Sequence, residues 1–311
     1  MAARQPVSCS GTLLNPLRSV SLWLLLVIAA VHQVLMGGTF VFARRVLVLT
    51  DPFAVAFMRY TLAGAILCAV ACRARKRPGT TPIAPADRMK IIILGLVIIL
   101  INQTFYLYGQ KLTTAAHGAL LFTLTPIFAY LMAMIRRSES WSYVKGTGII
   151  LAVVGSGVII LGKGLRLDPE TLKGDLIILV AVVAWAYYLV WGKPLVEKYG
   201  ALRITAYTLG SGAVAFFPFG LYRLATADLS RIDSLGWVSV LYIAIISSVI
   251  GYFIWYWLLK YMEASRVAVL SNAQPIVAGI LGIYLLGESL TLPFVLGGII
   301  ILAGVTITQK A

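Results

Sequence analysis

Ionisable side chains inside long apolar stretches are the first places in this chain where chemistry could occur. Arg59 lies in the apolar run 53–72, and His32 lies in the apolar run 21–42. A guanidinium in such a position could bind a substrate carboxylate or phosphate, or it could reach the interface or cap neighbouring carbonyls. An unperturbed histidine titrates near neutral pH, so His32 could take up and release protons, or it could bridge two helices by hydrogen bonds. Both alternatives stay open for each residue.

Amide and aromatic side chains at helical spacing form a second group of candidates. Gln103, Tyr106 and Gln110 recur at i, i+3 and i+7 and therefore share one face of a helix. We expect a pocket with apolar walls and a few hydrogen-bonding groups, although core packing or an interfacial aromatic belt would use the same residue types. The complete set of predicted substrate-binding residues is Arg59, His32, Gln33, Gln103, Tyr106, Trp185, Tyr188, Tyr252, Trp255, Asn272 and Gln274.

Membrane-spanning helices are needed to position these residues. Of the 311 residues, 60% are hydrophobic and only 12% are charged, whereas a soluble domain carries about 25% charged residues. A membrane span needs about 20 apolar residues, and long continuous runs predict helices rather than barrel strands. We predict an all-α polytopic membrane protein with ten transmembrane helices, near 21–42, 53–72, 91–110, 117–135, 146–162, 176–192, 204–222, 237–258, 267–286 and 292–308.

Lysine and arginine residues are distributed unevenly between the loops. The net charge is +15, but the basic residues form short clusters between apolar runs, which argues against nucleic-acid binding. If the N-terminus is cytoplasmic, 17 of the 26 basic residues lie inside and 8 lie outside, with Arg59 inside a span. The positive-inside rule therefore predicts a multi-pass protein of the cytoplasmic (inner) membrane with both termini in the cytoplasm.

The chain repeats itself at an offset of 149 residues. Residues that match at this offset are Lys111 and Lys260, Ala115 and Ala264, Pro126 and Pro275, Glu139 and Glu288, Gly148 and Gly297, and Gly155 and Gly304. We interpret the chain as a cytoplasmic segment 1–20, a five-helix repeat 21–162, a connecting loop 163–175 and a second five-helix repeat 176–308. Because five is odd, the two repeats must be inverted relative to each other, and the substrate site is expected between them near the midplane.

Several of these segments resemble the EamA-type transporters of the drug/metabolite transporter (DMT) superfamily. The resemblance is carried by residues 112–119 with Pro126, by residues 260–268 with Gln274 and Pro275, by residues 286–291 with Gly297, Gly298 and Gly304, and by Pro52, Arg59 and Ala63. The first helix departs from the family, with Met36-Gly37-Gly38 where the family often has Trp-Gly, and Ser138-Glu139 replaces the first Gly-Glu element. The resemblance implies a transporter of small polar metabolites, such as amino acids, that commonly moves them outward.

The predicted function is therefore transport of a small-molecule substrate across the lipid bilayer by alternating access, with protons as a candidate coupling ion. An integral-membrane enzyme that acts on lipids or headgroups is the alternative. It is disfavoured because the 11 acidic residues are scattered through loops and neither histidine is followed by an acid at four or five residues. No phosphate-binding Gly-Lys-Ser/Thr loop is present, which disfavours an ATP-driven pump. Three cysteines and two histidines form no metal or disulfide pattern, so no cofactor is expected. The sequence leaves the oligomeric state open.

Overall fold

The computed structural model describes residues 20–75, 82–112, 115–161, 169–274, 276–277, 280 and 291–311, and these residues form helices and no strand. The N-terminal residues 1–19, residues 163–168 of the predicted connecting loop, and Pro275 and Glu288 of the second repeat lie outside the described residues. In chain order the helices are α1 (Leu22–Leu47), α2 (Pro52–Arg75), α3 (Pro85–Leu96), η2 (Val97–Gln103), α4 (Thr104–Leu112), α5 (Ala115–Phe122), α6 (Thr125–Ile135), α7 (Tyr143–Leu161), α8 (Pro169–Tyr199), α9 (Ala201–Ala225), α10 (Ser234–Leu241), η3 (Tyr242–Gly251), α11 (Tyr252–Tyr261), α12 (Ala264–Leu270), η4 (Ser271–Ala273) and α14 (Leu292–Lys310).

The helices have the length and polarity of membrane spans. Among the described residues, six helical stretches are long and apolar enough to cross a bilayer, namely Pro52–Arg73, Pro85–Gly109, Pro169–Tyr199, Ala201–Ala225, Ser234–Tyr261 and Leu292–Lys310. The same part of the chain contains three shorter apolar helices, at Trp23–Thr39, Leu120–Ile135 and Tyr143–Ile159. Large apolar side chains such as Val214 (74% exposed) and Ile135 (79% exposed) cover the outside of the bundle. This confirms the predicted all-helical, multi-pass membrane class, because lipid is the solvent that tolerates such a surface.

Capping residues place the starts of the helices. The Ser21 hydroxyl accepts a hydrogen bond from the Leu24 N–H at the start of α1, and Asp233 does the same for Gly236 at the start of α10. Proline occupies the first position of α2, α3 and α8, where its missing N–H costs nothing. The structure corrects the predicted loop 163–175 here, because α8 begins at Pro169 and includes Glu170 in its first turn, where an acidic residue favours helix.

Two of the long helices contain irregular segments that hydropathy does not reveal. The third and eighth apolar runs each contain a stretch of π-helix, η2 and η3. The fourth run is broken at Thr123 and Leu124, just before Pro126, because proline cannot donate to the carbonyl four residues earlier and its ring crowds that turn. π-Helical segments such as η2 and η3 are rare and occur frequently at functional sites.

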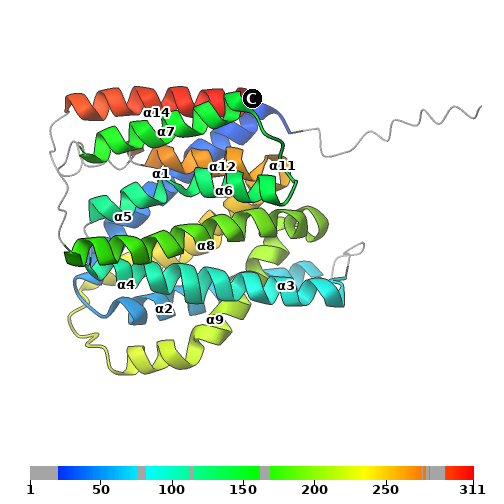
Figure 1. The fold of residues 1–311 in the computed structure, drawn as a ribbon. Helices are drawn as coiled ribbons and strands as arrows, with labels where there is room; N and C mark the ends of the chain where they lie inside the picture. Colours follow the sequence, from blue (N-terminus) through cyan, green and yellow to red (C-terminus); the bar gives the residue numbers. More distant parts are fainter. Residues whose placement is uncertain are drawn as a thin grey trace, which may run out of the picture.

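Two antiparallel helix pairs organise the bundle. α7 packs along α14, and the two helices lie side by side at one edge of the molecule in Figure 1. Their close approach uses glycines, with Gly155 beside Gly297 and Gly148 beside Gly304, which also shows that the helices run in opposite directions. α2 packs along α9 in the same antiparallel manner, on the other side of the bundle. Small residues at these contacts let the backbones come close, as is usual between helices in membranes.

Candidate functional site

An aromatic cluster forms where α8 meets α11. The ring centre of Trp185 lies 5.7 Å from Tyr188, 5.5 Å from Tyr252 and 5.9 Å from Trp255. Tyr188 in turn stacks on Tyr256 at 4.7 Å. Each such pair contributes about 0.5–1.5 kcal/mol beyond the area that it buries. The structure therefore brings four of the predicted site residues together, in a wall built from two helices that are far apart in sequence.

His32 and Gln33 of α1 border this cluster. The His32 ring lies 5.0 Å from the Trp255 ring, and its side chain is fully buried. Its Nε2–H donates to the Gly251 carbonyl at 3.1 Å, while the Gln33 amide donates to its Nδ1 at 3.2 Å. This assignment uses both ring nitrogens of a neutral imidazole.

Arg59 of α2 approaches the π-helical segment η3 on the neighbouring helix. Its Nε donates to the Ser248 hydroxyl at 2.6 Å, and one terminal nitrogen donates to the Ser247 hydroxyl at 3.0 Å. Its guanidinium also lies 4.9 Å from the centre of the Tyr60 ring. Within the described part of the chain no carboxylate pairs with it. A guanidinium has five N–H donors, so three remain for another acceptor.

Ser248 connects Arg59 to the aromatic residues. Ser248 accepts a hydrogen bond from Arg59 and lies four residues before Tyr252 on the same helical stretch, Ser234–Tyr261. Tyr252 is also part of the aromatic cluster, and Tyr106 packs edge-to-face on Phe122 at 5.3 Å. Arg59 and the aromatic cluster are therefore neighbours along this helical stretch.

The amides of η2 attach this segment to α8. Gln103 donates to the Asn102 side chain at 2.6 Å, and Asn102 donates to the Ala181 carbonyl at 2.7 Å. Ala181 lies one helical turn before Trp185. Gln103 thus faces the same helix that carries half of the aromatic cluster.

Asn272 contacts elements outside the aromatic cluster. The Asn272 amide donates to the Thr123 carbonyl at 3.3 Å, and the Ser156 hydroxyl lies 3.5 Å from the Asn272 carbonyl. Asn272 of η4 is therefore held where the break between α5 and α6 meets α7. Among the described residues, no hydrogen bond or ring contact joins Asn272 or Gln274 to the aromatic cluster.

Two buried polar atoms, one in the cluster and one beside it, lack hydrogen-bond partners among the described residues. Gln33 Oε1 is an acceptor and Trp255 Nε1 is a donor, and neither has a hydrogen-bond partner within the described residues. An unsatisfied buried polar group costs about 1–3 kcal/mol. Groups of this kind are suited to receive a polar ligand.

Sequence reasoning missed several neighbours of the predicted residues. Ser247 and Ser248 hold Arg59, Asn102 holds Gln103, and Tyr60 and Tyr256 extend the aromatic surface. Two adjacent serines in an otherwise apolar run were the available signal, because hydroxyls inside a span need a partner.

Ionic contacts lie at the two ends of the bundle. At one end Asp51 accepts the N–H groups of Phe53 and Ala54 and pairs with Arg223 of α9. Partial burial opposes ionisation of the Asp51 carboxyl, but Arg223 and these N–H groups outweigh it and hold its pKa below the usual value.

At the opposite end Glu139 joins the two halves of the chain. Its carboxylate accepts the Ser265 N–H at 3.1 Å, the Ser265 hydroxyl, and Lys145 Nζ at 3.2 Å. Lys145 also pairs with Glu263 at 2.6 Å. Burial opposes ionisation of Glu263, yet Lys145 and Arg266 outweigh it and lower its pKa. Glu139 therefore caps α12, as expected for an acidic residue at a helix N-terminus.

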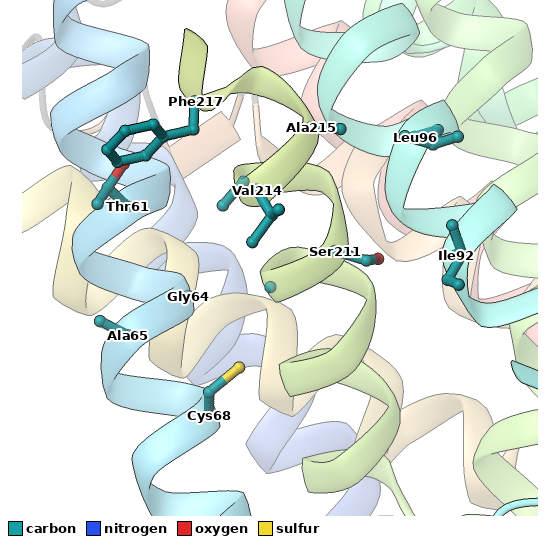
Figure 2. Close-up of a pocket in the computed structure, with 12 residues that line it drawn as sticks. Thr61, Gly64, Ala65, Cys68, Ile92, Leu96, Ser211, Val214, Ala215 and Phe217 are labelled. Carbon is teal, nitrogen blue, oxygen red and sulfur yellow. The ribbon is translucent and has the colours of Figure 1, made fainter. Parts of the chain in front are cut away.

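A separate apolar hollow of about 550 Å³ lies on the outer surface between α2, α3 and α9 (Figure 2). Thr61, Ala65 and Cys68 line it on α2, and Ile92 and Leu96 line it on α3. None of its lining residues belongs to the predicted site.

No group of three or more His, Cys, Asp or Glu side chains gathers among the described residues.

Comparisons with known proteins agree with this architecture. The sequence profile of the EamA-like transporter family matches residues 21–161 and 172–309. An uncharacterized transporter of Archaeoglobus fulgidus is 28% identical over 262 residues, covering 84% of this chain and 89% of that protein. The uncharacterized transporter YyaM of Bacillus subtilis is 27% identical over 272 residues, covering 86% and 88%.

A solved crystal structure is similar in fold. It superposes with a TM-score of 0.76 over 92% of this chain and 96% of the other, at 18% sequence identity. Since the family profile spans both halves of the sequence, this chain belongs to the EamA-like transporter family.

Proposed function

We propose that this membrane protein transports a small metabolite that carries a carboxylate, such as an amino acid or a related compound, by alternating access. The proposed direction is export, as the family resemblance implies. The proposed binding site lies between Arg59, the aromatic cluster of Trp185, Tyr188, Tyr252 and Trp255, and the amides of α1 and η2.

The observation that carries the proposal is that Arg59 has no charged partner among the described residues. Its described partners are neutral hydroxyls, and three of its N–H groups have no acceptor among the described residues. A charged side chain inside a membrane span costs at least about 2.5–3.5 kcal/mol. A substrate carboxylate would accept two N–H groups from the guanidinium side by side and balance its charge.

The aromatic cluster supports a substrate with a second, cationic or apolar part. Ring faces attract ammonium groups, and their edges pack on apolar side chains. The unpartnered Gln33 Oε1 and Trp255 Nε1 would supply one acceptor and one donor. A zwitterionic amino acid offers matching groups for all three features.

The positions of the helices support two inverted five-helix repeats. Corresponding elements start 149 residues apart in four cases: α2 and α9 at Pro52 and Ala201, α3 and α10 at Pro85 and Ser234, α5 and α12 at Ala115 and Ala264, and α7 and α14 at Tyr143 and Leu292. Two of these pairs, α2 with α9 and α7 with α14, pack against each other in opposite directions. Similar units in opposite orientation can exchange their conformations, which is the basis of alternating access in such transporters.

Cysteine labelling tests the inverted topology. In a variant without Cys9, Cys68 and Cys72, single cysteines would replace Lys111 and Lys260 in turn. We expect an impermeant maleimide added outside intact cells to label position 111 and not position 260. The proposed topology, with both termini in the cytoplasm, requires this result. Labelling of both positions from one side would contradict the proposed repeat.

Flux measurements test the proposed substrate class. Purified protein would be screened with L-amino acids and monocarboxylates by thermal shift, and compounds that stabilise it would be followed by counterflow in proteoliposomes without ATP. We expect Arg59→Gln to lower uptake at least tenfold, because loss of a charged hydrogen bond costs about 1.5–3 kcal/mol, and Arg59→Lys to retain part of it. Arg231→Gln, which removes a 74% exposed guanidinium paired in a loop, is the matched control and should keep full flux. Equal flux in Arg59→Gln and Arg231→Gln would remove Arg59 from the site.

A further inference from the structure

The hollow between α2, α3 and α9 is open to lipid and apolar. α9 contributes the small residues Gly210, Ser211, Ala213 and Ala215, and the side chains of α2 and α3 stand on either side of it (Figure 2). Ala65 and Ile92 line the hollow and are exposed on the outer surface of the bundle. Because a depression in a membrane-facing surface has no water to fill it, a lipid chain is the apolar material at hand.

Two arginines lie one to two helical turns beyond the same end of the hollow, by their positions in the sequence. Arg88 lies four residues before Ile92, on the same face of α3, and Arg73 lies five residues beyond Cys68 on α2. Both are exposed, and neither pairs with an acidic side chain in the described ranges. This end of the surface therefore carries two basic groups that are available for an anion.

The distance from the hollow to the arginines matches one leaflet of a bilayer. Thr61 lies twelve residues from Arg73, or about 18 Å along the helix, and Leu96 lies eight residues from Arg88, or about 12 Å. One leaflet of hydrocarbon is about 15 Å thick. A phospholipid with its acyl chain in the hollow would thus place its phosphate beside the two arginines.

We propose that this surface is a binding site for an anionic phospholipid of the leaflet that contains Arg73 and Arg88. The acyl chain fills the hollow between α2, α3 and α9, and the headgroup pairs with both guanidinium groups. The site is separate from the proposed substrate site and does not depend on it.

Native mass spectrometry of the purified full-length protein tests this site. The protein would be incubated with equal amounts of phosphatidylglycerol and phosphatidylcholine of identical acyl chains. We expect wild-type protein to retain phosphatidylglycerol at least tenfold over phosphatidylcholine. The double variant Arg73→Gln/Arg88→Gln should lose this preference, because each basic residue near a phosphate contributes about a fivefold effect. Arg137→Gln/Lys310→Gln removes two other exposed charges at the same end and should keep it.

A second pair of variants tests the hollow itself. Ala65→Trp adds an indole to its lining and should lower retention of both lipids, whereas Ala30→Trp on the exposed surface of α1 should not. Unchanged melting temperature and elution volume would show that each variant is folded. Equal retention of the two lipids by wild type, an unchanged preference in Arg73→Gln/Arg88→Gln, or full lipid retention by Ala65→Trp would each overturn the proposal.

Discussion

Arg59 and His32 lie in the first two helices and Asp51 immediately precedes the second, and the partners of these three ionisable residues differ in charge. Arg59 is held by two serine hydroxyls, His32 by a carbonyl and an amide, and Asp51 by an arginine. An ionised group with neutral partners still favours a counter-ion, whereas a group already paired has no such need. Of the three, Arg59 is therefore the residue suited to bind a charged substrate.

His32 is predicted to stabilise the structure through its two hydrogen bonds and not to bind and release protons during transport. Protonation would add a proton to Nδ1, which already accepts from the Gln33 amide. We expect His32→Gln to lower the free energy of unfolding by about 1–3 kcal/mol through lost hydrogen bonds, while the pH dependence of proteoliposome flux stays unchanged. Gln309→Ala, which removes a buried amide at the end of α14 that donates to the Arg266 carbonyl, is the matched control for stability alone. A flattened pH profile in His32→Gln would instead support proton coupling through this residue.

Asp51 is predicted to make stability depend on pH at the acidic end. Its pKa in the folded protein lies below the usual value, so its contribution is present above pH 4, roughly the unfolded pKa, and is lost as the pH falls through the folded pKa. We expect the apparent melting temperature of wild type to fall between pH 5 and about 3 more steeply than that of Asp51→Ala. At pH 7 Asp51→Ala should be less stable by about 1–2 kcal/mol, because it loses both a helix cap and an ion pair.

At the scale of elements, departures from regular helix coincide with the candidate site. Ser247 and Ser248 lie in η3, and Asn102 and Gln103 lie in η2. The Ser248 hydroxyl donates to Ile243 five residues earlier, which fits the wider π-helical turn. A wider turn changes which side chains face the neighbouring helices, so the π-helical segments position polar residues that a regular helix would place elsewhere.

The α7–α14 contact is predicted to tolerate no added atom at Gly155. A Cβ at this position would lie 2.7 Å from the Gly297 carbonyl oxygen, which is backbone and cannot move aside easily. We expect Gly155→Ala to destabilise the protein by about 1–3 kcal/mol, as overpacking does. Gly146→Ala on the same helix meets nothing within 4 Å and should be neutral or stabilising by up to about 1 kcal/mol. Thermal unfolding followed by tryptophan fluorescence would compare them, and an equal change in both variants would contradict the close approach.

On the scale of the whole molecule, contacts between the two halves close the end where Glu139 lies. Glu139 and Lys145 follow the first-half helix α6, and they bind Ser265 and Glu263 at the start of α12. If the transporter alternates, these contacts must break when this end opens.

Removing the Glu139 charge is predicted to favour opening at this end. Glu139→Gln loses the ion pair with Lys145, so the open conformation should become more populated. We expect a cysteine introduced at Met262, which is 6% exposed, to be labelled by a maleimide several-fold faster in Glu139→Gln than in the parent protein lacking native cysteines. Asp228→Asn, which breaks an exposed pair with Arg231 in a loop, should leave the rate unchanged. Identical rates in all three proteins would contradict a gating role for Glu139.

The sequence alone determined the membrane class, the approximate positions of the helices and the family. These properties follow from local composition and from residues such as Gly148 and Pro126 that recur in order along the chain, and local features are visible without coordinates. It also identified Arg59 and the aromatic residues as candidates, since a charge or a tyrosine in an apolar run is conspicuous. Helix starts such as Pro169 were misjudged, because polar residues can be helical outside an apolar run.

Only the tertiary structure decided which candidates meet. Trp185 and Tyr252 are 67 residues apart in the chain and adjacent in space, whereas Asn272 contacts Thr123 and Ser156 instead of them. The partners of Arg59 lie on a π-helical segment that hydropathy cannot detect, because such a segment has the same composition as regular helix. Which side chains share a site depends on helix crossing and on local winding, and both are set by packing between distant parts of the chain.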